Sequence, residues 1–76
     1  MIDPIEPTVR EIIAAVTHVH PDVEVRATIC LAHVEFGLRS HTRSATRNVS
    51  KFSIASVPGE VAMCLTGLAG LLLEES

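Results

Sequence analysis

The sequence is poor in aromatic residues: its 76 residues include no tryptophan, no tyrosine and two phenylalanines. Because 47% of the residues are hydrophobic, the chain can still form a core, but a core of aliphatic side chains. A chain of this length is a single domain, residues 1–76, and it buries only about 60% of the surface that its unfolded form exposes. Self-association is a common remedy for so small a core.

Cysteine is also scarce, and the two that occur, Cys30 and Cys64, are too few to form a disulfide framework. The N-terminus shows no basic region followed by an apolar segment, which a secretory signal would have. We therefore expect a cytoplasmic protein in which both thiols are free.

Signatures of catalysis and of cofactor binding are missing. There is no glycine-rich phosphate loop, and both cysteines lie in apolar runs, where a thiol packs rather than reacts. A monomer of this size also rarely encloses a small-molecule pocket of ordinary volume. These absences predict a protein that is not an enzyme and that has no cofactor.

The histidines do not form a recognisable metal site. The residues that could contribute ligands are His18, His20, Cys30, His33 and His41. Cys30 and His33 have a tolerable spacing, but they point to opposite faces of a regular strand. His18 and His20 fall in the last turn of a predicted helix, where the helix dipole favours an imidazolium. We expect no metal ligands among them.

The stretch from Val23 to Leu38 is the longest one with the composition and alternation of a β-strand. Its apolar residues occupy odd positions from 23 to 31 and even positions from 32 to 38. A shift of one residue exchanges the two faces of a strand, so one continuous strand needs a bulge near residues 30–32. The alternative is that residues 29–32 are buried on both faces.

Two further segments predict helices. Valine and isoleucine recur at helical spacing from Pro7 or Thr8 to near His20, after residues 1–6, which we interpret as a leader. Residues 58–75 begin with a proline and continue as the apolar run Val61 to Leu73. Its thirteen residues are fewer than the roughly 20 that a membrane span needs, so the run predicts a buried helix.

The remaining segments complete the predicted fold. Residues 49–57 have strand-like content and should pair with the long strand, while residues 39–48 contain no large apolar side chain and predict an exposed basic loop. The fold class is therefore a small single α+β domain of helix-strand-strand-helix order. We expect two helices packed on one face of an antiparallel sheet, completed by dimerisation. An all-helical bundle is the alternative, which the β-branched residues between 23 and 34 disfavour.

Dimerisation is predicted because a two-stranded sheet is marginal in water and the last helix is apolar on more than one face. Small residues at four-residue intervals in that helix form a groove that another backbone could approach closely. The predicted partner for this groove is a second copy of the chain, or the first helix in a monomer. The residues of the predicted dimer interface are Val34, Phe36, Ala62, Thr66 and Gly70.

Charge is the clearest functional feature. Residues 39–51 carry +4 and no acid, whereas the rest of the chain carries two basic residues against nine acids, so the net charge of −3 conceals a dipole. This segment is the predicted site of partner binding, through Arg39, His41, Arg43, Arg47 and Lys51. We expect an acidic protein surface as its partner. The alternative is a nucleic acid, whose phosphates the arginines would grip without any aromatic side chain to stack on bases.

These features predict a small non-enzymatic binding protein that acts through protein–protein contact. The alternative function is that of a nucleic-acid-binding accessory protein that uses the basic loop. No motif identifies a family. In general type, a short acidic α+β chain with one basic loop resembles the small accessory proteins of phages and mobile elements that inhibit another protein by blocking it.

Overall fold

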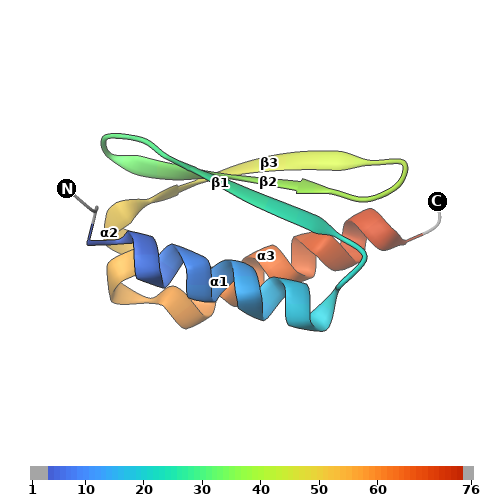
Figure 1. The fold of residues 1–76 in the computed structure, drawn as a ribbon, viewed down its shortest axis with the longest axis horizontal. Helices are drawn as coiled ribbons and strands as arrows, with labels where there is room; N and C mark the ends of the chain where they lie inside the picture. The colour runs from blue at the N-terminus through green and yellow to red at the C-terminus, as the bar shows by residue number, and fades with distance from the viewer. Residues whose placement is uncertain (1–3, 75–76) are drawn as a thin grey trace.

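The computed structural model describes residues 4–74, which form an α+β fold in which all the helices lie on one side of a three-stranded sheet (Figure 1). The predicted fold class is thus confirmed, although the order of elements is longer than expected. The elements are α1 (Glu6–Val19), β1 (Glu24–Ile29), β2 (His33–Arg39), β3 (Ser44–Ser50), α2 (Lys51–Ser56) and α3 (Pro58–Leu73).

The predicted long strand is wrong: it is a hairpin of two strands, β1 and β2, joined by a tight turn. The turn is closed by a bond that Cys30 N donates to the carbonyl oxygen of His33, at 2.8 Å. Ile29 lies opposite Val34, so odd positions of β1 share a face with even positions of β2. The reversal of the chain therefore accounts for the shift in apolar parity, and neither a bulge nor burial on both faces is needed.

The predicted basic loop is also mostly strand. Only residues 40–43 form the connection between β2 and β3, where Ser40 N donates to the carbonyl oxygen of Arg43 at 2.8 Å. β3 pairs antiparallel with β2 along its whole length. Its polar composition suits an edge strand, because only Ala45 and Val49 are partly buried against the core.

The segment predicted as a second strand, residues 49–57, is instead the end of β3 followed by α2. Ser50 ends the strand and caps the helix, since its Oγ accepts a bond from Ser53 N at 3.1 Å. Phe52 and Ile54, which a strand would place on one side, are separated: Ile54 is fully buried and Phe52 is exposed.

The two long helices agree with the sequence pattern. α1 buries Val9, Ile12 and Val16, the apolar stripe that the spacing predicts. It begins at Glu6, and Ile5 belongs to the core, so the predicted leader is wrong for these two residues; residues 1–3 lie outside the described part of the chain. Within that part, no helix is both long and apolar enough to cross a membrane.

Two residues of the predicted dimer interface belong to the monomer's own core. Val34 and Phe36 are 0% exposed on the helix-facing side of β2, which removes their side chains from any surface that a second copy could contact. Their strand is the middle one of the sheet, and even positions of β2 point toward the helices.

The other three predicted interface residues lie on α3, which packs against α1. Ala62, Thr66 and Gly70 are half-buried, and a Cβ atom at Gly70 would lie 3.6 Å from Nε2 of His20. The first helix and the residue after it thus take the position that a second copy was predicted to occupy. Homodimerisation stays a prediction, and it needs a different surface.

Candidate functional site

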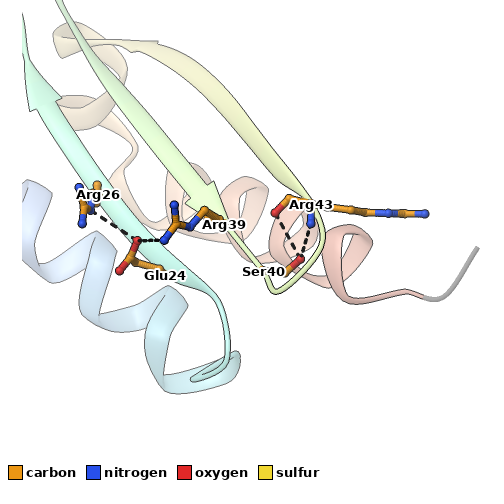
Figure 2. A network of polar contacts seen from close by, with 5 residues as sticks. All are labelled: Glu24, Arg26, Arg39, Ser40 and Arg43. Carbon is orange, nitrogen blue, oxygen red and sulfur yellow. Dashed lines mark hydrogen bonds and ion pairs between the residues drawn. The ribbon is translucent and has the colours of Figure 1, made fainter.

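The predicted basic residues do not form one patch, and two of them have partners at the β2–β3 turn (Figure 2). Nη2 of Arg39 lies 3.9 Å from Oε1 of Glu24, which also contacts Arg26 at 3.5 Å. Arg43 donates through Nη1 to the carbonyl oxygen of Leu71 at 3.5 Å, near the end of α3, where the helix dipole favours a cation. Arg39 is therefore screened by an acid, and Arg43 supports the fold.

The remaining three basic residues are well separated. His41 is exposed in the turn, and Lys51 begins α2 at the far end of β3. Arg43 and Lys51 lie at the two ends of the seven-residue strand β3, eight residue steps apart, which is about 26 Å at 3.3 Å per step. Arg47 lies between them, opposite Phe36, so its side chain points to the helix side of the sheet.

β3 forms an edge of the sheet, since among residues 4–74 it pairs with β2 and with no other strand. The bond between Ser40 N and the carbonyl of Arg43 fixes which of its backbone groups are used. Bonded pairs alternate along an antiparallel ladder, so residues 45, 47 and 49 exchange bonds with β2. The N–H and C=O groups of Thr46 and Asn48 therefore point away from the sheet.

A groove of 560 Å³ runs between this edge and α3. Its lining comes from the edge strand, from α2 and the α2–α3 connection, and from one side of α3. The residues that line it are Arg47, Asn48, Val49, Ser53, Val57, Glu60, Val61, Cys64, Leu65, Gly67, Leu68 and Leu71. Its inner surface is predominantly aliphatic, and its charged residues are one arginine from the strand and one glutamate from the helix.

The groove exists because α3 is apolar on two adjacent faces. One face, with Leu65 and Ala69 at its centre, is buried against the sheet. The second face turns toward the β3 edge, where Leu68 is half-buried, Cys64 is exposed and Leu71 is 58% exposed. Apolar surface next to an unpaired strand edge is typical of a site that binds an extended polypeptide.

The two charged residues of the groove, Arg47 and Glu60, have no charged partner among the described residues. Both charges are therefore open to a ligand. The described residues contain no group of three or more histidine, cysteine, aspartate or glutamate side chains that could hold a metal ion. The arrangement offers hydrogen bonds, apolar contact and charge.

Sequence reasoning included Arg47 but missed the rest of this site. The sequence shows that α3 is apolar on more than one face, but this pattern predicts dimer packing and does not indicate a groove. The free edge was not visible, because β3 had the composition of a loop. Comparison of the chain with protein-family models, curated proteins and solved structures found no match, so the site is defined by its geometry alone.

Proposed function

We propose that this protein is a non-enzymatic binding protein that captures an extended segment of another protein in the groove between β3 and α3. One observation carries the proposal: the free backbone groups of Thr46 and Asn48 belong to the edge strand that lines an apolar groove of 560 Å³. A segment added to β3 as a fourth strand would satisfy these groups and cover the apolar side chains of α3.

The expected binding mode separates affinity from specificity. Main-chain bonds to the strand edge supply affinity for any extended backbone, and alternate side chains of the ligand enter the groove and supply selectivity. An interface made by one added strand is small, so we expect transient binding rather than a permanent complex. An inhibitor of the accessory-protein type would act this way by occupying a segment that its target needs.

The test compares two substitutions at one edge position. Thr46→Pro removes an N–H group that faces the edge and leaves the bonds to β2 in place, since edge strands tolerate proline at such positions. Thr46→Val changes the side chain and keeps the N–H. We expect peptides enriched from a random display library on the Thr46→Val protein to bind the Thr46→Pro protein about fivefold more weakly in fluorescence anisotropy.

Equal affinity for the two variants would show that the edge is not used. A library from which nothing is enriched above a bare support would contradict the proposed function as a whole. Circular dichroism melting curves for both variants control for unfolding.

The nucleic-acid alternative has weaker support, because the basic residues are dispersed and the outer face of the sheet also carries acids. Glu24 and Glu35 occupy that face together with Arg26 and Arg39, and a mixed surface attracts phosphates poorly. A mobility-shift assay on generic duplex at low salt should show no complex. A shift that weakens steeply with salt would favour the alternative.

Homodimerisation is proposed at the other edge of the sheet. Since Cys30 and His33 form a bonded pair, the backbone groups of residues 25, 27 and 29 face the free edge of β1. Two copies of β1 paired antiparallel about Ala27 would place Val25 opposite Ile29, both apolar and half-buried. Such a dimer leaves the β3 groove open on each copy.

A further inference from the structure

We propose that the groove selects an extended segment in which one acidic residue is flanked, two positions away on either side, by apolar residues. This inference rests on the proposed function and adds the chemistry of the ligand. Arg47 is the residue that sets the selectivity.

The register of an added strand follows from the free backbone groups. We propose that the segment adds antiparallel to β3, so the ligand residues that bond to Thr46 and Asn48 lie directly opposite them and point to the outer, polar face of the sheet. The ligand residues between and beside these two lie opposite positions 45, 47 and 49, and their side chains point toward α3. Three ligand side chains, spaced two residues apart, therefore point to the helix side of the sheet, and those opposite Arg47 and Val49 enter the groove that these two residues line.

The middle of these three positions lies opposite Arg47. Its guanidinium is exposed on the helix side of the sheet, and no acid pairs with it among the described residues. Directly opposed residues on one face of a sheet interact most strongly, and opposite charges stabilise the pair. A carboxylate at the middle ligand position satisfies this cation, whereas an ammonium group there would be repelled.

The ligand side chains on either side of the middle position contact apolar surface. The bond from Arg43 to Leu71 places the C-terminal end of α3 beside the start of β3, so Val61 and the rest of its N-terminal half lie beside the end of the strand. The ligand residue opposite Val49 thus packs near Val61, and the one opposite Ala45 packs near Leu71. Aliphatic side chains suit both places.

The second charge of the groove limits the ligand further. Glu60 lies in the first turn of α3, beyond the position opposite Val49. An acid placed there would meet a like charge, so a uniformly acidic segment is disfavoured. The groove therefore favours a single centred carboxylate over a polyanion.

Arg47 also argues against a second copy of β3 as the occupant. Two seven-residue strands that pair antiparallel over their full length place the middle residue opposite its own equivalent. In β3 the middle residue is Arg47, and two guanidinium groups would face each other across the pair. A foreign segment with an acid at this position has the complementary charge.

The test uses end-blocked seven-residue peptides of threonine, with valine at the second and sixth positions and a variable fourth residue. NMR titrations measure the affinity of each peptide for the wild type, for Arg47→Glu and for Arg47→Gln. We expect the wild type to prefer glutamate over lysine by about fivefold, Arg47→Glu to reverse the preference and Arg47→Gln to remove it.

The outcomes separate the inference from the proposed function. If all peptides bind the wild type equally, and Thr46→Pro weakens them all, strand addition stands and selection by Arg47 is wrong. If the Arg47→Glu protein still prefers the glutamate peptide, a cation other than Arg47 recognises the peptide's carboxylate and the inference is overturned. If neither peptide binds the wild type at millimolar concentration although the random library yields binders, the inferred ligand pattern is wrong and the proposed function stands; if the library also yields none, both fail.

Discussion

Phe36 and Phe52, the two aromatic residues of the chain, have opposite environments. Phe36 is 0% exposed in the centre of the core, whereas Phe52 is 79% exposed on α2. Phe36 is the largest of the fully buried side chains, and the others in that group are aliphatic. In a core this small, one ring accounts for a large share of the buried apolar surface.

This contrast predicts unequal effects of the same substitution. Phe36→Ala should lower the free energy of unfolding by about 3–5 kcal/mol, since it leaves a cavity that the neighbouring aliphatic residues fill only in part. Phe52→Ala should change it by less than about 0.5 kcal/mol. Urea denaturation followed by circular dichroism measures both, and equal losses would contradict the described core.

For individual residues, the sequence predicts burial well where an apolar pattern repeats over several turns of a helix. Val9, Ile12 and Val16 lie on one helix face in the core as their spacing indicates. Arg47 was identified by its charge, but its position on the helix side of the sheet depends on a strand register that no local pattern predicts. The charge of Arg47 thus indicates a candidate binding residue, but the direction of its side chain can be obtained only from the fold.

Among the elements, the helices were more predictable than the strands. The β1–β2 turn, Cys30-Leu31-Ala32, contains none of the glycine, proline, asparagine or aspartate residues that usually mark a hairpin. A turn and a bulge both shift the apolar residues of a sequence from odd to even positions. Because no turn residues are present, a bulge is the simpler interpretation of the sequence. Only the closing bond between Cys30 and His33 distinguishes them.

β3 and α2 were misassigned for a different physical reason. An edge strand needs apolar residues only where it touches the core, so β3 has a loop-like composition with Ala45 and Val49 as its inward apolar residues. α2 has six residues, too few for helical periodicity to emerge. A serine cap at Ser50 was the one local signal for it. The candidate groove could not be predicted, because it depends on which strand forms the edge.

In the molecule as a whole, the two edges of the sheet have different chemistry. The helix-facing residues of β1 are Val25, Ala27 and Ile29, all uncharged, whereas β3 has Arg47 at the centre of its helix-facing side. A charge that points inward on an edge strand opposes pairing with an identical strand. The β1 edge is therefore the one suited to self-association, and the β3 edge is suited to a foreign segment.

Self-association through β1 is testable by mass. Sedimentation equilibrium at micromolar concentration should give about twice the 8.2 kDa of the chain. Ala27→Pro, which removes an edge-facing N–H from the centre of β1, should give a monomer, whereas Thr46→Pro on the opposite edge should not alter the mass. A wild type that stays at the chain mass up to high concentration would rule out the dimer.

Amide hydrogen exchange along β3 tests strand addition most directly. In the free protein the amides of Thr46 and Asn48 face the open edge and should exchange quickly, while those of residues 45, 47 and 49 are bonded to β2 and exchange slowly. Adding the peptide with valine at the second and sixth positions and glutamate at the fourth should slow Thr46 and Asn48 together and leave Ala27 unchanged. Saturation with this peptide that leaves Thr46 and Asn48 exchanging as fast as before would contradict strand addition in the β3–α3 groove.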